Sequence, residues 1–224
     1  MKTFLIANPK GGSGKSTLAT NLAGYFARCG HQVMLGDTDR QQSAREWLNI
    51  RPAVLPPIQN WVMDDEEPAR PPKGSTHVVL DTPAGLHGKA LDRMLKQVNR
   101  IIVPVQPSLF DILATRQFLE TLLEEKKVRK ERAFVAVVAM RVDPRTRAAG
   151  ELERFLNSYD LPVLTHLRDT QLYVQLAANG MTVFDLTASR AEKDLAQWQP
   201  IIDWVEGKPI PAPAVSAITM PPQS

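Results

Sequence analysis

The sequence predicts an α/β protein: a single domain with a doubly wound, mainly parallel sheet flanked by helices. The first observation is that short β-branched or aliphatic runs alternate with segments of helical periodicity, which is typical of βαβ units. The second is that 224 residues, 43% of them apolar and 23% charged, suit one globular domain. The third is that the longest strongly apolar run, residues 134–140, is far shorter than the roughly 20 residues that span a bilayer. We therefore expect a cytoplasmic protein without a membrane segment.

The expected elements follow in chain order. Helical spacing places Leu18, Leu22 and Phe26 on one face, so a helix is expected over residues 15–29, with Gly30 as its stop. Further helices are expected at residues 42–48, 111–125, 150–159 and 190–205. Strands are expected at residues 3–8, 33–37, 77–81, 101–105 and 134–139, with at most one short strand, 58–62, inside the Pro-rich and acidic segment 52–72. The domain should span residues 1–207, and residues 208–224, which hold five prolines, should form a flexible tail.

Charge and cysteine content narrow the possible functions. The single cysteine, Cys29, excludes an internal disulfide framework and a Cys-rich metal site. There are 27 Lys and Arg against 24 Asp and Glu, so the formal net charge is +3. This is a weak sign of an acidic partner, and the distribution of the cations along the chain matters more.

A glycine-rich loop lies between the first expected strand and the first expected helix, at residues 9–17. Its glycines leave room for the backbone to wrap around phosphates, and the positive end of the following helix attracts anions. Lys15 would neutralise the β- and γ-phosphates, and the Ser16 hydroxyl would ligate Mg²⁺. A chance Gly-rich turn is the alternative, but the strand–loop–helix context favours a nucleotide site. The residues expected to bind nucleotide here are Lys10, Gly11, Gly12, Ser13, Gly14, Lys15, Ser16 and Thr17.

The loop differs from the usual pattern, because Pro9 stands where glycine is usual and a second lysine, Lys10, follows it. If two molecules faced each other across their nucleotides, Lys10 of one could reach the phosphates bound by the other. The alternative is a solvent-exposed loop lysine. The residues alone leave the two interpretations equally open.

Carboxylates follow two of the expected strands. Asp37 and Asp39 end one strand and Asp81 ends another, and ligands of open α/β sheets bind at such carboxyl ends. Asp81 fits the Walker B role of holding Mg²⁺ through its water shell, Asp39 fits the role of orienting the attacking water, and Asp37 could support the metal. A turn or a cap of the helix at residues 42–48 is the alternative for Asp37 and Asp39. The expected metal site therefore consists of Ser16, Asp39 and Asp81.

Four segments together resemble the ParA/MinD ATPases that carry a deviant Walker A loop: residues 8–16, 37–41, 81–85 and 103–108. The resemblance extends over roughly residues 2–206 and is strongest to short, ParF-like ParA proteins. It implies slow, partner-stimulated ATP hydrolysis in a sandwich dimer with ATP at the interface. Lys10 would be the signature lysine, with Lys10, Lys15 and Asp39 as catalytic residues, and Met140 and Arg141 would lie near the adenine. Two features depart from the family: Arg40 stands where proline is usual, and residues 52–72 replace a helical insert.

The resemblance also implies three partners: a second copy of the chain, nonspecific double-stranded DNA, and a small activating protein similar to ParB, ParG or another cargo adaptor. The protein would then be associated with the nucleoid. DNA binding needs cations that face phosphates, although a solvated helix end is the alternative for any one of them. The candidate DNA contacts are Lys126, Lys127, Arg129, Lys130, Arg145, Arg147, Arg168, Arg190 and Lys193.

Two other functions stay open at this point. An ATP-dependent metabolic enzyme with the same loop would need further catalytic groups, and the four histidines show no clustered motif. A MinD-like membrane regulator would need an amphipathic anchor, which the Pro-rich tail does not resemble. The favoured function is an ATPase that partitions plasmid or chromosomal DNA or positions another cargo.

Overall fold

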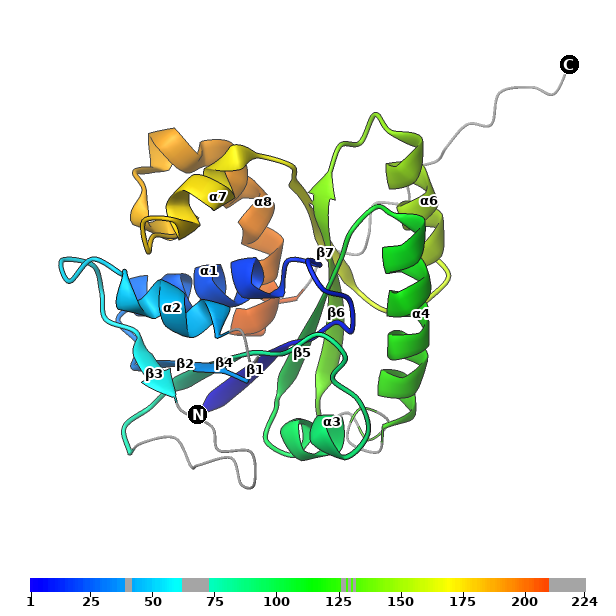
Figure 1. The fold of residues 1–224 in the computed structure, drawn as a ribbon, viewed down its shortest axis with the longest axis horizontal. Coiled ribbons are helices and arrows are strands. Elements are labelled where there is room, and N and C mark those ends of the chain that lie inside the picture. Colours follow the sequence, from blue (N-terminus) through cyan, green and yellow to red (C-terminus); the bar gives the residue numbers. More distant parts are fainter. Residues whose placement is uncertain (39–41, 62–72, 126–127, 129, 131, 210–224) are drawn as a thin grey trace, which may run out of the picture.

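Seven strands form one sheet in the order β3-β2-β4-β1-β5-β6-β7 (Figure 1). The computed structural model describes residues 1–38, 42–61, 73–125, 128, 130 and 132–209. All six neighbouring strand pairs are parallel. The expected fold class is confirmed, and the described sheet is entirely parallel. Its strands are β1 (Lys2–Ile6), β2 (Val33–Asp37), β3 (Gln59–Trp61), β4 (His77–Asp81), β5 (Arg100–Val105), β6 (Phe134–Val142) and β7 (Val163–Arg168).

Helices cover both faces of the sheet, which is why its strands are apolar on both sides. Alternate residues of β1 point in opposite directions: Phe4 and Ile6 join one core cluster, and Leu5 joins the other together with Ala7, which follows the strand. The first cluster lies under α1 (Lys15–Arg28), α2 (Ser43–Asn49), α7 (Gln171–Ala177), the short 3₁₀ helix η1 (Val183–Asp185) and α8 (Ala188–Glu206). The second lies under α3 (Gly88–Leu95), α4 (Leu109–Glu124) and α6 (Arg147–Leu156). Across the described helices, none is both long and apolar enough to cross a membrane.

The path of the chain reverses its direction across the sheet beside β1. From β1 the chain moves outward through α1 to β2 and through α2 to β3, with both helices on one face. It then returns at β4 and moves in the other direction through β5, β6 and β7, with α3, α4 and α6 on the opposite face. In doubly wound sheets, ligands bind at the carboxyl ends of the strands where this direction reverses. Here that position is flanked by β4, β1 and β5.

Three helices begin earlier than the sequence predicts: α4, α6 and α8, the last at residue 188 instead of 190. In α4 and α6 the cause is a side-chain cap. Ser108 accepts a hydrogen bond from the backbone N–H of Asp111 (3.2 Å), so α4 starts at residue 109 instead of 111. Thr146 accepts the N–H of Ala149 (3.2 Å), so α6 starts at residue 147 instead of 150. The expected bounds of the second strand, 33–37, and of the strand at 77–81 are confirmed. Elements α3, β7 and α7 were not expected.

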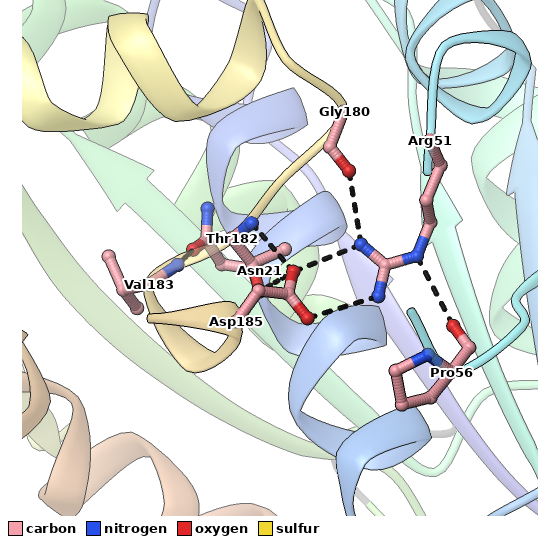
Figure 2. Close-up of polar contacts among 7 residues, drawn as sticks. All are labelled: Asn21, Arg51, Pro56, Gly180, Thr182, Val183 and Asp185. Carbon is pink, nitrogen blue, oxygen red and sulfur yellow. Dashed lines mark hydrogen bonds and ion pairs between the residues drawn. The ribbon is translucent and has the colours of Figure 1, made fainter. Parts of the chain in front are cut away.

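A buried ion pair joins the end of α2 to the C-terminal half of the chain (Figure 2). Nη1 of Arg51 lies 3.0 Å from Oδ2 of Asp185, and the two side chains are 5% and 0% exposed. The same guanidinium also donates to the carbonyl oxygens of Gly180 (3.1 Å) and Pro56 (3.3 Å). Asp185 in turn accepts the backbone N–H and the hydroxyl of Thr182, each at 2.8 Å. The pair therefore fixes α2 against η1.

Helix α1 packs closely on the same segment. Oδ1 of Asn21 accepts the backbone N–H of Val183 at 3.0 Å, within the group of residues drawn in Figure 2. A Cβ on Gly24 would lie only 2.6 Å from Cγ2 of the fully buried Thr182. Glycine is therefore required at position 24 for α1 to reach its place beside η1. These contacts with the segment at η1 therefore fix the position of α1, the helix that follows the glycine-rich loop.

Candidate nucleotide-binding site

The glycine-rich loop connects β1 to α1 at the carboxyl edge of the sheet (Figure 1). Gly12 and Gly14 have φ angles of +77° and +100°, a region in which other residues are strained. Helix α1 begins where the N–H of Leu18 donates to the carbonyl of Gly14 at 3.0 Å. Its N-terminus has no side-chain cap, and its first turn holds no acidic residue. The positive end of the α1 dipole therefore lies at the glycine-rich loop, where it can attract an anion.

The loop fits a phosphate group in two further respects. Oγ of Ser13 is buried and has no hydrogen-bond partner among the residues that the structure describes, so it can bond to a ligand oxygen. Space is also open beside the backbone at Gly11 and Gly12, where a Cβ would meet no atom within 4 Å. ATP bound here would supply the phosphoanhydride bond. The loop backbone, Lys15 and Ser16 would hold its phosphates and metal.

The two lysines of the loop lie in different environments. Lys15 is 7% exposed, and its Nζ donates to the carbonyl oxygen of Lys10 at 2.9 Å. Lys10 is exposed, and its backbone N–H donates to Oδ1 of Asn8 at 2.8 Å. Lys15 therefore lies across the inside of the loop, while the side chain of Lys10 is in contact with solvent.

Two amide side chains that the sequence did not single out hold the loop to the sheet. Nδ2 of Asn8 donates to the carbonyl of Pro104 (2.6 Å) and to Oγ1 of Thr115 on α4 (2.9 Å), both buried. Nε2 of Gln106, which follows β5, donates to the carbonyl oxygen of Gly12. The position of Asn8 directly before the glycines is a sequence signal for a role in the loop. Its partners lie about a hundred residues away, so the sequence does not indicate which residues they are.

The carboxylates meet at the edge that β2, β4 and β1 share. Asp81 is 1% exposed and lies in register with Asp37 of β2 and Ile6 of β1. Its carbonyl oxygen accepts the backbone N–H and the hydroxyl of Thr38, each at 3.1 Å. Downstream of Asp81, the hydroxyl of Thr82 donates to the carbonyl of Ile6 at 2.8 Å. The end of β4 is therefore tied to the strand that carries the glycine-rich loop.

Asp37 caps the following helix. Its Oδ2 accepts the N–H groups of Ala44 (2.7 Å) and Arg45 (3.2 Å) at the start of α2. This is the alternative that the sequence left open for Asp37. Asp39 lies outside the described residues, so the structure is silent on its position. In the described part of the chain, no three His, Cys, Asp or Glu side chains form a cluster that could hold a metal ion.

Met140 and Arg141 lie at the end of β6 and differ in environment. Met140 is 4% exposed, and a Cβ on Gly14 would lie 2.7 Å from its Cε, so its side chain packs against the glycine-rich loop. Arg141 is exposed and has a φ of +52°. The register between β6 and β7 shifts between Ala139 and Val142, so Met140 and Arg141 oppose a single residue of β7, as in a β-bulge. Contact of either side chain with adenine stays a prediction.

The candidate DNA contacts divide into paired and unpaired cations. Arg168 pairs with the buried Asp194 at 2.8 Å. Arg145 pairs with Asp143 at 2.9 Å and lowers the pKa of that carboxyl to about 2, and Arg147 pairs with Glu151 at 3.1 Å. Lys126, Lys127 and Arg129 lie outside the described residues. The described candidates that are exposed and make no ion pair with described residues are Lys130, Arg190 and Lys193.

Comparison with known proteins identifies the family of this chain. A family model described as "CobQ/CobB/MinD/ParA nucleotide binding domain" matches residues 4–183. Maintenance of carboxysome distribution protein A of Halothiobacillus neapolitanus is 28% identical over 199 residues, covering 83% of this chain and 88% of that protein. Chromosome-partitioning ATPase Soj of Thermus thermophilus is 28% identical over 192 residues, covering 71% and 77%. The structure of a Cyanothece McdA variant in complex with ATP matches the fold with a TM-score of 0.72 at 14% identity, covering 95% of this chain and 98% of that one. The chain therefore belongs to the CobQ/CobB/MinD/ParA nucleotide-binding family and is a ParA/MinD-type P-loop ATPase.

Proposed function

We propose that this ATPase binds ATP and Mg²⁺, dimerises across its bound nucleotides, and then associates with nonspecific DNA until a partner protein stimulates hydrolysis. Cycles of this kind would position a cargo, either partitioned DNA or another cellular assembly, over the nucleoid. The observation that carries the proposal is the contrast between the two lysines of the loop. Lys15 is buried within the loop, whereas Lys10 is exposed.

The exposure of Lys10 favours a role outside its own subunit. Lys15 already supplies a cation inside the loop, and its Nζ lies 2.9 Å from the carbonyl of Lys10. The backbone of Lys10 is held by Asn8, so its side chain starts from a fixed position at the rim of the site. A cation supplied across a dimer would stabilise the charge that develops on the transferred phosphoryl group, as an arginine finger does.

Hydrolysis would depend on the carboxylates at the strand ends. We propose that Asp81 holds Mg²⁺ through water together with Ser16, and that Asp39 orients the attacking water. Asp39→Ala should keep ATP binding and dimerisation while abolishing turnover. Unchanged turnover would remove Asp39 from this role.

DNA binding would use the exposed surface of α8. Arg190 and Lys193 are three residues apart on this helix and therefore lie on one face. Both are exposed and unpaired with described residues, in contrast to Arg168, whose guanidinium is held by Asp194 at 2.8 Å. A dimer would present this face twice and so increase the number of counterions released on binding.

The cargo is proposed only as a class. The printed names of two relatives refer to carboxysome distribution and to chromosome partitioning. We propose that this chain likewise acts on an assembly or a DNA molecule through an adaptor similar to ParB or ParG. The finer resemblance to ParF-like proteins stays a prediction.

The decisive experiment compares the oligomeric state with ATP–Mg²⁺ and with ADP–Mg²⁺ by sedimentation velocity. The wild-type protein should dimerise with ATP only. Lys10→Gln should bind ATP but remain a monomer, while Lys208→Gln, a matched change at an exposed lysine, should dimerise normally. A Lys10→Gln protein that dimerises like the wild type would contradict the proposed role of Lys10.

The DNA step has its own test. Fluorescence anisotropy with an arbitrary duplex should show ATP-dependent binding that weakens steeply with salt. The double variant Arg190→Gln/Lys193→Gln should weaken this binding by about tenfold, and Arg154→Gln on α6 should not change it. ATP-bound dimers that ignore DNA at low salt would refute the DNA step and leave the dimer intact.

A further inference from the structure

A cavity of about 170 Å³ opens at the amino-terminal edge of the sheet, at the opposite end of the strands from the nucleotide site. Three of the residues that line it lie in a single row across adjacent strands, near the amino-terminal ends of these strands. Phe4 of β1 is in register with Arg100 of β5, and Arg100 is in register with Phe134 of β6. Residues in register on parallel strands point to the same face, here the face covered by α8. The remaining lining residues are Lys2, Asn99 and Arg132.

The guanidinium of Arg100 packs against two aromatic rings in the cavity. Its Cζ lies 4.8 Å from the ring centre of Trp204 and 5.5 Å from that of Phe134. Among the described residues it makes no hydrogen bond or ion pair through its guanidinium, and burial lowers its pKa. A half-buried guanidinium therefore has donors available in an orientation that the two rings fix.

Two further cations line the same space. Arg132 is exposed and makes no ion pair with any described residue. Lys2 lies 3.5 Å from Glu206, so this lysine is partly neutralised. Glu206 also attracts Arg100, so this one carboxylate offsets part of the charge of both Lys2 and Arg100. Among the described residues, three cations against one carboxylate leave the cavity with a net positive charge. Phe4, whose side chain is fully buried, is also a lining residue.

We propose that this cavity is a second anion site that binds a phosphate group, separate from the nucleotide loop. A tetrahedral anion with several acceptor oxygens matches two guanidinium groups, which donate in pairs, and the cavity is large enough to take one phosphate. The phosphate can belong to free phosphate or a small phosphate ester, or to the backbone of DNA. The chemistry at Arg100 and Arg132 is the same in each case.

The first arm of the test uses inorganic phosphate. The nucleotide loop is first saturated with a non-hydrolysable ATP analogue and Mg²⁺, and phosphate is titrated against chloride at constant ionic strength. The Nε–Hε NMR signals of Arg100 and Arg132 should shift and saturate, with a dissociation constant of the order of 1 mM. Arg132→Gln should weaken this binding by about fivefold or more, because one of the two guanidinium groups is lost. Arg154→Gln on α6 should leave it unchanged.

Arg132 is the primary variant because its side chain is exposed, so its loss does not disturb packing. Arg100→Lys serves as a second variant that keeps the charge but removes the planar donor group, and it should also weaken phosphate binding. A phosphate response that does not saturate, or that is equal in Arg132→Gln and Arg154→Gln, would overturn the proposal.

The second arm identifies the source of the phosphate. If DNA supplies it, Arg132→Gln should also weaken duplex binding and reduce the slope of log K against log salt by about 1. If phosphate binding is lost but DNA binding is unchanged, the site serves a small phosphate compound. If Arg132→Gln weakens DNA binding but the wild type shows no saturable phosphate response, the proposed phosphate site is wrong. Loss of one positive charge would then explain the weaker DNA binding. The phosphate titration requires neither dimerisation nor DNA. Its result therefore tests the phosphate site even if the proposed function is wrong.

Discussion

Lys15 donates a hydrogen bond from its Nζ to the carbonyl oxygen of Lys10, 2.9 Å away. One lysine thus spans the loop and contacts the backbone of the other, whose own side chain is exposed. The two positions can therefore be changed independently, and their substitutions should have different effects.

Lys15→Gln should abolish nucleotide binding itself. The variant removes the cation that faces the β- and γ-phosphates and also the hydrogen bond across the loop. We expect ATP affinity to fall by about a hundredfold or more, because a hydrogen bond between charged groups in a partly buried site contributes about 3 kcal/mol. Isothermal titration calorimetry would measure this. Lys10→Gln should retain ATP affinity within about threefold, and equal losses in both variants would contradict the assignment.

Asn8→Ala should lower both stability and nucleotide affinity. The change leaves the carbonyl of Pro104 and the hydroxyl of Thr115 without their amide partner and removes the acceptor for the N–H of Lys10. The free energy of unfolding should fall by about 2 kcal/mol, measured by urea titration. The control is Thr115→Val, which removes only one of these bonds and should cost about 1 kcal/mol with ATP affinity unchanged. An Asn8→Ala protein as stable as the wild type would show that these bonds contribute little.

Arg51→Leu should be strongly destabilising although Arg51 does not touch the nucleotide loop. It leaves the carboxylate of Asp185, which is 0% exposed, without its guanidinium. We expect a loss of about 3–5 kcal/mol in the free energy of unfolding. The exposed pair of Arg147 and Glu151 provides the contrast, since Arg147→Leu should change stability by no more than about 0.5 kcal/mol. The double variant Arg51→Leu/Asp185→Leu should lose less than the sum of its single changes, and strict additivity would argue against a coupled pair.

Mild acid should weaken the fold through His77. Burial, and then the nearby His31 and Lys2, lower the pKa of His77 to about 4, so the folded chain keeps this ring neutral. The unfolded chain takes up a proton near pH 6.5, and the free energy of unfolding should therefore fall as the pH drops from 6.5 to about 4. The expected change between pH 7 and pH 5 is about 1 to 2 kcal/mol.

Comparison of urea titrations at these two pH values tests this expectation. His77→Phe should remove most of the pH dependence, because Phe preserves the ring contact with Phe26, whose centroid lies 4.4 Å away. His166→Gln, at an exposed position, should retain it. A pH dependence that is the same in His77→Phe and the wild type would assign it to other groups.

The fold and the core of the site could be predicted because their signals are local. The strands at 33–37 and 77–81 are aliphatic runs that each end in an aspartate, and the structure begins and ends them at the predicted residues. The glycines of the loop follow one another within a few residues, and two of them, Gly12 and Gly14, have the positive φ angles that glycine tolerates. Their position between β1 and α1 is confirmed.

Two of the unexpected elements, α7 and β7, lack these local signals, whereas α3 does not. In α3, Leu91, Met94 and Leu95 recur at helical spacing on one face, and sequence reasoning missed this pattern. In α7 only Leu176 is buried, so its apolar face is narrow. Strand β7 alternates poorly because its register with β6 shifts twice. Its pairing with β6 thus depends on geometry that the segment itself does not encode.

The supporting contacts of the site could not be predicted, because their partners are far apart in sequence. Asn8 and Thr115 are separated by 107 residues, Gln106 and Gly12 by 94, and Arg51 and Asp185 by 134. In the sequence alone, nothing distinguishes each of these residues from a polar residue that makes no long-range contact. The sequence allows Asp37 to support the metal or to cap α2, and only the structure shows that it caps α2.

The close approach of Gly24 to Thr182 affects how a mutational scan of this protein should be interpreted. In a saturation library selected for ATPase function, nearly every substitution at position 24 will be depleted, as strongly as those at Lys15. Gly24 is ten residues beyond Gly14, on a face of α1 that points away from solvent, so that depletion will report a steric collision and not lost chemistry. Pairing Gly24→Ala with a smaller residue at position 182, such as Thr182→Gly, should distinguish the two, since a second change can relieve crowding but cannot restore a missing catalytic group.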